Sequence, residues 1–342
     1  MLALEADTFG EARRMDRLGQ LRQYVDIGRQ RGLEIGPLVS PIVTPELGTI
    51  YYADHAATDE LRKKYADVPS IDEDRITPVD FVWGELTLAE STAAVAPFDY
   101  VVASHVIEHV PDIVGWLREV ADVLTPGGRL CLVIPDRRLT FDVRRRPSDL
   151  AEMVEAYLLR LRRPSLRATF DYFSRSLEVD TTALWHGRPA YPDNAPVNFS
   201  QGWEFASRAA RTSDYIDTHC WVFSDAEFVQ LIGDLMRMNL IDFRFVGFAA
   251  PLVGDLEFFA VLERLDSTLS AADKISVALD SLPGPDDMAT VPLPPPPPQP
   301  EPFDPLRLWG ATLSKREIAI ILAKRGVMAR ARNLAGRFRS HS

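Results

Sequence analysis

Hydrophobic and polar positions follow two different periods between Phe98 and Pro135. Tyr100–Ala103 is a short apolar run with β-branched residues at its centre, which is typical of a strand buried on both faces. A Pro-Gly-Gly sequence at 126–128 marks a stop, and a second buried strand follows at Leu130–Ile134. Between the two strands, apolar residues recur at the spacing of an amphipathic helix, namely at Ile113, Leu117, Val120, Ala121 and Leu124. The pattern predicts a β-α-β crossover between parallel strands.

Three further strands are expected ahead of this unit. Residues 1–31 are expected to form an N-terminal helical segment, because apolar residues recur at helical spacing over 11–31. The strand patterns follow at Gly32–Gly36, Thr49–Asp54 and Ile76–Phe81, and a short charged helix is expected at Thr58–Tyr65. The crossover therefore supplies strands four and five.

Residues 137–222 interrupt this alternation with a helical stretch near 148–163 and an irregular, aromatic-rich region. Ser224 and Glu227 then form a capping-box pattern that begins a helix ending near Met238. Residues 241–248 and 257–262 read as an antiparallel pair at the sheet edge. We therefore predict an α/β, Rossmann-like domain over 32–265. It has a seven-stranded, mostly parallel sheet, helices on both faces, and a substrate lid inserted at 137–222 between strand five and the last helix.

The composition changes after residue 265. Residues 266–305 are polar and then proline-rich, with an unbroken proline run at 294–298, and are predicted to be a disordered linker. Residues 306–342 are expected to form a basic amphipathic helix, because 313–339 carry eight Lys or Arg against the single acid Glu317. Its apolar residues favour attachment to an anionic membrane surface or a protein partner, and the alternative is a solvated tail.

Composition narrows the classes of function. A net charge of −11 argues against general nucleic-acid binding. Cys131 and Cys220 offer neither a disulfide framework nor a zinc spacing, and His186 and His219 lack neighbouring ligands, so metal independence is expected. The sequence has neither the Gly-x-Ser-x-Gly elbow of hydrolases nor a phosphate-cradling loop. The lack of a signal-like or membrane-spanning run predicts a cytoplasmic enzyme.

The phrases FDYVV, HVIEHV and VLTPGGRL in this order resemble the class I S-adenosylmethionine-dependent methyltransferases of the type 11-like group. The resemblance covers residues 30–136 well and 219–265 more loosely. It implies S-adenosylmethionine as the cofactor and transfer of a methyl group to a small-molecule or glycan acceptor. In open parallel sheets, ligands bind beyond the carboxyl ends of the strands, so the site is expected there.

The resemblance also implies roles for residues at these strand ends. Glu34 and Gly36 match the acidic-glycine loop of the family, but Leu38 and Ser40 replace its later glycines. Asp54 closes the second strand, where a carboxylate can accept both ribose hydroxyls of adenosine. The other cofactor positions are Asp80 for the adenine amino group, Phe81 beside the ring and Ser104 at the methionine end.

Methyl transfer to a hydroxyl needs a base within hydrogen-bond reach. His105 is the best-placed candidate because it follows the fourth strand and imidazole titrates near neutrality. Bracing of the loop is an equally open role for His105. His109 is a second candidate, but bracing of the loop is favoured over catalysis for it. The remaining candidates lie on the substrate side of the cleft and are Asp136, Arg137, Arg138 and His219. Oxygen is the expected acceptor atom only because His105 offers a base.

Two other functions stay open at this point. A nicotinamide-dependent oxidoreductase also uses a strand-loop-acid adenosine site. The missing later glycines and the Ser104-His105 pair weigh against it. A non-catalytic, methyltransferase-like scaffold protein is the third reading, and the degenerate glycine loop is the feature that supports it.

Overall fold

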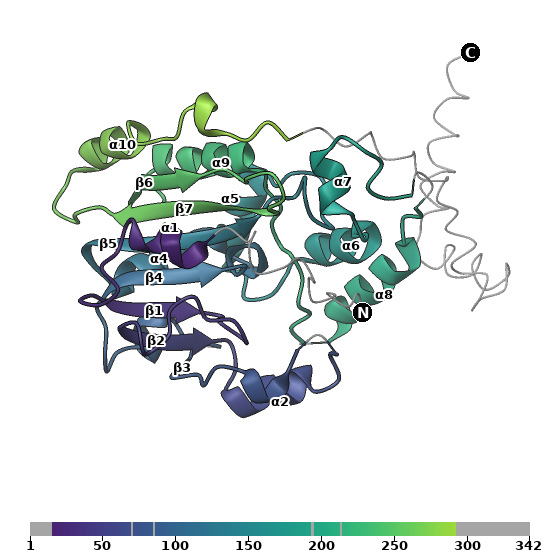
Figure 1. Cartoon of the computed structure of the whole chain (residues 1–342), viewed down its shortest axis with the longest axis horizontal. Coiled ribbons are helices and arrows are strands. Elements are labelled where there is room, and N and C mark those ends of the chain that lie inside the picture. Colours follow the sequence, from purple (N-terminus) through teal and green to yellow (C-terminus); the bar gives the residue numbers. More distant parts are fainter. Residues whose placement is uncertain (1–15, 70, 85, 193–194, 213, 292–342) are drawn as a thin grey trace, which may run out of the picture. The chain divides into compact units, whose positions relative to one another are not determined.

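The computed structural model describes residues 16–291, except 70, 85, 193–194 and 213. Its centre is one seven-stranded sheet of order β3-β2-β1-β4-β5-β7-β6 (Figure 1). Strands β1 to β5 pair in parallel, and β7 runs antiparallel to both β5 and β6. The strands are β1 (Arg31–Ile35), β2 (Thr49–Asp54), β3 (Phe81–Val82), β4 (Phe98–Ser104), β5 (Leu124–Pro135), β6 (Phe243–Ala249) and β7 (Glu257–Arg264). This confirms the predicted fold class, including the antiparallel pair at the edge.

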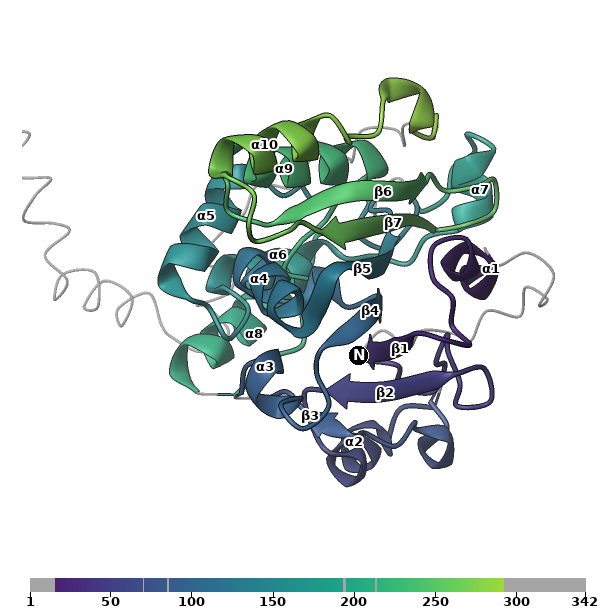
Figure 2. The same cartoon turned by 90° about the vertical axis from the view of Figure 1, so that its left-hand side faces the viewer.

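Helices cover both faces of the sheet (Figure 2). In β4, Val101 and Ala103 point into one core layer, whereas Tyr100 and Val102 point into the other. This double burial explains the continuous apolar run of the strand. The larger layer is closed by α4 (Ile113–Val123), α5 (Leu150–Leu159) and α9 (Asp225–Arg237), and the smaller one by α1 (Arg17–Arg22).

The remaining helices lie around this framework. They are α2 (Thr58–Tyr65), α3 (Leu88–Ser91), α6 (Leu166–Arg175), α7 (Thr181–Trp185), α8 (Phe199–Arg211) and α10 (Ala271–Leu279), with 3₁₀ turns η1 (Glu73–Arg75), η2 (Ile107–His109) and η3 (Pro285–Asp287). Within the described residues, no helix is long and apolar enough to span a bilayer.

The segment predicted as an insertion contains α5 to α8. Helix α5 belongs to the main core, because its Met153 and Ala156 are buried in the larger layer. Helices α6, α7 and α8 instead group together beside the ends of the strands (Figure 1). Phe173 of α6 stacks on Phe205 of α8, with ring centroids 3.7 Å apart. These two rings therefore pack α6 against α8.

Three boundaries differ from the sequence predictions. Part of the predicted linker is ordered, because Ser270 caps α10 and the apolar Ala278 is buried against the sheet domain. The third strand comprises only Phe81–Val82 and lies later than expected. The N-terminal helix is shorter, since α1 ends at Arg22 and turns lead into β1. Residues 1–15, 292–305 and the predicted basic helix 306–342 lie outside the described residues.

Candidate active site

The loop after β1 turns through two left-handed residues. Gly36 has φ +67°, and a Cβ atom there would lie 2.9 Å from a methyl group of Val106. Glycine is therefore required by both the backbone angle and the close approach. Leu38 adopts φ +44°, although it stands where the family pattern has a glycine. The loop thus keeps a glycine-like turn at Leu38 without the glycine.

Glu34 of β1 holds the following loop in place through hydrogen bonds. Its carboxylate accepts hydrogen bonds from the backbone amides of Ile42 at 2.8 Å and Val43 at 3.1 Å, and only 1% of the residue is exposed. Burial raises the pKa of Glu34 to about 7, although these hydrogen bonds and Arg17 favour the ionised form. Glu34 therefore shapes the loop, and its carboxylate faces the protein interior.

Asp54 lies at the carboxyl end of β2 and is buried. Its Oδ1 accepts the backbone amide of His55 at 2.7 Å and also lies 2.6 Å from Nδ1 of that histidine. Both contacts use Oδ1, and Oδ2 makes none within the described part of the chain. Asp54 thus offers one acceptor oxygen at the edge of the sheet where ligands of parallel sheets bind.

Asp80 and Phe81 lie differently from the sequence prediction. Asp80 precedes β3 rather than ending it, and its Oδ2 accepts the backbone amide of Tyr52 at 2.9 Å. The ring of Phe81 packs on Tyr51, with centroids 5.7 Å apart, and joins the larger core layer. These contacts give both residues a structural role, and their assignment to the adenine stays a prediction.

Ser104 ends β4 and His105 follows it. Strand β4 is next to β1, which leads into Gly36, and Asp54 ends β2 one strand further along the sheet. His105 has φ +53° and points its imidazole toward the start of β7. Its Nε2 lies 2.7 Å from Oε2 of Glu257, and Arg17 binds both carboxylate oxygens of Glu257 at 2.6 and 2.8 Å. A third of the His105 side chain stays exposed. The structure therefore presents an oriented imidazole whose partner carboxylate is held in place by an arginine.

The ionised form of Glu257 is strongly stabilised. Burial alone would raise the pKa of this carboxyl, but the hydrogen bonds from His105 and Arg17 outweigh it and lower the pKa to about 2. Glu257 therefore carries a negative charge beside His105 throughout the neutral range.

We expect Glu257→Gln to reduce the dependence of stability on acid pH. A carboxyl with a pKa of about 2 in the folded chain and 4.5 as its ordinary value stabilises the fold above pH 4.5 and loses this contribution as the pH falls toward 2. Between pH 6 and pH 4, the wild type should lose about 1 kcal/mol more than the variant. Urea unfolding at both pH values measures this difference, and parallel losses in the two proteins would contradict it.

The residues after β5 have internal partners. Arg137 binds Glu227 of α9 through two hydrogen bonds of 2.7 Å. Arg138 binds the fully buried carboxylates of Asp136 and Asp225, each at 2.6 Å. These contacts fasten β5 to the start of α9. The charges that the sequence left open thus have partners inside the protein, and the role of Asp136, Arg137 and Arg138 in binding the substrate stays a prediction.

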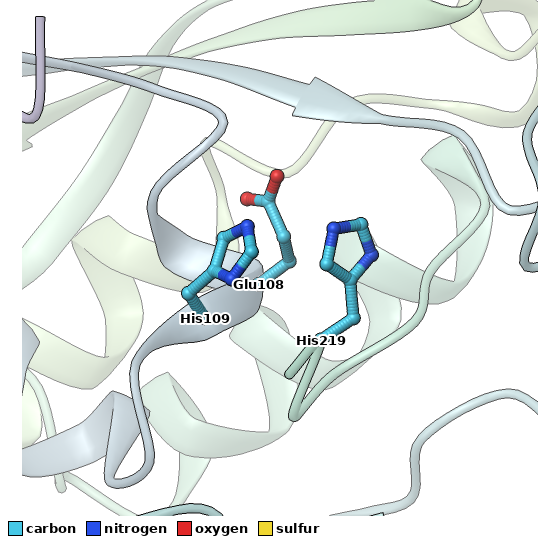
Figure 3. A group of neighbouring side chains, drawn as sticks. All are labelled: Glu108, His109 and His219. Carbon is cyan, nitrogen blue, oxygen red and sulfur yellow. The ribbon is translucent and has the colours of Figure 1, made fainter. Parts of the chain in front are cut away.

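A second group of polar side chains surrounds η2. Glu108 and His109 come from η2, and His219 faces them from the segment before α9 (Figure 3). The backbone carbonyl of Glu108 accepts the amides of Cys220 at 2.6 Å and Trp221 at 3.1 Å. These hydrogen bonds fix the segment that carries His219 against η2. The structure thus brings together two histidines that the sequence analysis treated separately, with ring centroids 4.6 Å apart.

Each of these histidines has a carboxylate partner. Nδ1 of His109 lies 2.9 Å from Asp217, and Nδ1 of His219 lies 2.6 Å from Asp142. Asp142 is also bound by the buried Arg145 at 2.9 Å. Burial opposes the ionisation of Asp142, but His219 and Arg145 outweigh it and lower its pKa to about 2. Both imidazoles are therefore held in defined orientations.

Sequence reasoning missed most of these partners. Glu257 lies 152 residues from His105, Asp217 lies 108 residues from His109, and Asp142 lies 77 residues from His219. No local pattern links residues so far apart. The only sequence signal was position, because Glu257 starts a predicted strand, and that strand begins at the edge of the sheet where β5 ends.

A cavity of about 510 Å³ lies away from this region. It is lined by Arg22–Gly28 and Leu47, which precede β1 and β2. The amino-terminal ends of parallel strands lie at the edge opposite their ligand-binding ends. This cavity is therefore separate from the site described above.

Comparison with known proteins identifies the family. The model of the methyltransferase domain family matches residues 17–232, which is well over half of the chain. None of the curated proteins matches this sequence significantly.

Several solved structures have a similar fold. One is an S-adenosylmethionine-dependent methyltransferase from Methanosarcina mazei, with 18% identity, coverage of 72% of this chain and 96% of that one, and a TM-score of 0.35. Another is the CcbJ methyltransferase from Streptomyces caelestis, with 14% identity, coverage of 73% and 90%, and a TM-score of 0.37. The chain spans about half of the CurJ carbon methyltransferase structure, with 13% identity, coverage of 74% and 54%, and a TM-score of 0.34. These similarities are too low to bear on substrate or mechanism.

The family match decides between the classes of function that the sequence left open. It runs through β1 to β5, η2 and the segment that carries His219. A nicotinamide-dependent oxidoreductase and a non-catalytic scaffold are therefore set aside. Because the match includes every parallel strand of the sheet, this chain belongs to the methyltransferase domain family and is an S-adenosylmethionine-dependent methyltransferase.

Proposed function

We propose that this enzyme binds S-adenosylmethionine across the carboxyl ends of β1, β2 and β4 and methylates a hydroxyl oxygen of a small-molecule or glycan acceptor. Two observations support the cofactor position. Asp54 presents its unused Oδ2 where a ribose is expected. Gly36 keeps the first loop free of a side chain, so the backbone can approach the methionine part of the cofactor. Ser104, at the adjoining end of β4, completes this proposed site.

The preference for oxygen rests on His105 and Glu257, with 2.7 Å between Nε2 and Oε2. With its Nε2 proton donated to Glu257, His105 has its Nδ1 lone pair free to accept a proton. That Nδ1 atom lies 3.7 Å from Oε1 of Glu108 and thus faces the η2 cluster. A hydroxyl placed there loses its proton to His105, and the charge of Glu257 stabilises the imidazolium that forms.

The cofactor supplies an electrophilic methyl group on a sulfonium sulfur when it is bound. The protein's part is to hold the acceptor oxygen in line with that carbon, to take up the proton and to exclude water. His105 takes the proton, while α6, α7 and α8 form the side of the site on which the acceptor is expected (Figure 1). The aromatic rings of Phe141 and Tyr172, packed around His219 at 4.8 and 5.6 Å, support a wall for a ring-shaped acceptor.

A panel of matched acceptors tests this proposal. Phenol and sugar scaffolds that carry a hydroxyl, an amine or a thiol at the same position are incubated with methyl-labelled S-adenosylmethionine. We expect the label on hydroxyl oxygen, because proton uptake by His105 matters most for an acceptor that is neutral and weakly nucleophilic. Transfer confined to the amine or thiol scaffolds would contradict the assignment to oxygen.

A further inference from the structure

The carboxylate of Glu108 lacks a hydrogen-bonding partner. Only 1% of this residue is exposed, and neither of its oxygens accepts a hydrogen bond from the residues that the structure describes. Nδ1 of His105 lies 3.7 Å from Oε1, which is beyond hydrogen-bond distance. A buried carboxylate is normally paired, hydrogen-bonded or bound to a metal. The environment of Glu108 therefore points to a cation that the side chains do not provide.

His109 and His219 complete a set of ligands around the same space. Their Nδ1 atoms are engaged by Asp217 and Asp142, so in the neutral imidazole each Nε2 atom keeps its lone pair. A carboxylate behind each imidazole is the arrangement that orients metal-binding histidines in proteins and raises their basicity. One ligand atom from each of Glu108, His109 and His219 lies within 4.8 Å of the others. Metal–ligand bonds of about 2.1 Å require only a modest inward movement of the three side chains.

The supporting contacts make this arrangement rigid. Asp142 is fixed by Arg145, which also binds Asp171 at 2.8 Å and the backbone carbonyl of His219 at 2.9 Å. Arg145 is itself buried, so the pair formed by Asp142 and His219 cannot swing into solvent without breaking a buried network. Such a preformed outer layer is typical of metal sites.

We infer that Glu108, His109 and His219 bind one divalent transition-metal ion. Two imidazole nitrogens and one carboxylate oxygen suit Mn²⁺, Fe²⁺, Co²⁺ or Zn²⁺ better than Ca²⁺ or Mg²⁺, which prefer oxygen ligands. Three protein ligands leave positions open for water or an acceptor oxygen. This inference departs from the expected metal independence, which considered His219 without the residues that folding places beside it.

The metal site also has a role in catalysis, and this part of the inference rests on the proposed function. An acceptor hydroxyl bound at an open position of the ion becomes more acidic. Its proton passes to Nδ1 of His105, which faces Glu108. The acceptor is therefore a molecule whose hydroxyl oxygen can bind a metal ion, and the base and the ion act on the same oxygen.

Metal titration of the full chain tests the site. Protein stripped with a chelator is titrated with Co²⁺, whose visible absorption reports its ligands, and with Zn²⁺ by calorimetry. We expect one ion per chain and a weakening of at least 30-fold in Glu108→Gln and in His219→Gln. His186→Gln is the matched control, since His186 is exposed at the end of α7, and it should bind as the wild type does. Circular dichroism verifies that each variant is folded.

The outcomes separate this inference from the proposed function. A rise in the melting temperature of the wild type with Zn²⁺ gives a second readout, which does not depend on the variants. The metal site would be overturned if the folded wild type showed no saturable metal binding. It would also be overturned if Glu108→Gln and His219→Gln bound the metal as tightly as the wild type does. S-adenosylmethionine binding is measured in the same stripped protein. If the stripped protein binds metal but not S-adenosylmethionine, the result counts against the proposed function alone, because Asp54 and Gly36 do not contact the metal ligands.

Discussion

Replacing Asp54 with alanine is expected to weaken the binding of S-adenosylmethionine by about 30- to 100-fold. A carboxylate that accepts charged hydrogen bonds from two ribose hydroxyls contributes about 2–3 kcal/mol. Asp54 is suited to this role because Oδ1 is fixed by His55 and Oδ2 has no contact within the described residues. Calorimetric titration of wild type and variant with S-adenosylmethionine measures the change.

Asp59→Ala is the matched control for this prediction. Asp59 is an acid of α2 only five positions away, and 82% of its side chain is exposed. Its removal changes the net charge equally but should leave the affinity within about twofold of the wild type. Equal affinities in wild type and Asp54→Ala would contradict the ribose role of Asp54 and place the adenosine elsewhere.

Replacing His105 with asparagine should lower kcat by about 100- to 10,000-fold, the range expected for removal of a general base. Asparagine is chosen because it tolerates the left-handed backbone at this position, where φ is +53°. The affinity for S-adenosylmethionine should remain near that of the wild type, because the predicted role of His105 concerns the acceptor proton. Initial rates of S-adenosylhomocysteine release with a hydroxyl acceptor measure kcat.

The Glu257→Gln variant distinguishes the effect of the base His105 on kcat from the effect of its positioning residue Glu257. This variant keeps the imidazole but removes the charge that orients and stabilises it at 2.7 Å. We expect its kcat to lie between those of the wild type and His105→Asn, with KM little changed. A His105→Asn variant that keeps more than half of the wild-type kcat would show that His105 is not the base.

The parts of the fold that the sequence predicted correctly are those with strong local signals. The bounds of β2 and α2 match the residue pattern, because a short strand pattern that closes at Asp54 is followed by a charged helical pattern. The start of α9 is confirmed as well. Ser224 accepts the amide of Glu227, and the rings of Phe223 and Phe228 lie 5.5 Å apart, as expected for a capping box with an adjacent hydrophobic contact.

Errors arose where composition was a poor guide to packing. Residues 266–291 are polar enough to suggest a linker, but Leu282 packs over Gly233 of α9, at 3.1 Å from where a Cβ would stand. A few well-spaced apolar residues are enough to dock a helix. The predicted bounds of the third strand were wrong for a related reason, since the two residues of β3 give almost no periodic signal.

Only part of the candidate site could be predicted from the sequence. Residues at strand ends, such as Asp54 and His105, follow from the rule that parallel strands end at one edge. Their partners do not, because Glu257 and Asp142 reach the histidines from distant segments. The same limit applies to Arg137 and Arg138. Nothing in the sequence indicates that Glu227 and Asp225 neutralise their charges. Charged residues near a site thus need their partners identified before they are assigned to a ligand.

Calorimetric titration of the folded wild-type chain with S-adenosylmethionine, and with NADH under the same conditions, tests whether the strand ends of the sheet form a site for S-adenosylmethionine. We expect saturable binding of one S-adenosylmethionine per chain with micromolar affinity and no binding of NADH. A folded protein that binds NADH, or that binds neither compound, would contradict it, because the loop through Gly36 and Leu38 would then not form the cofactor site.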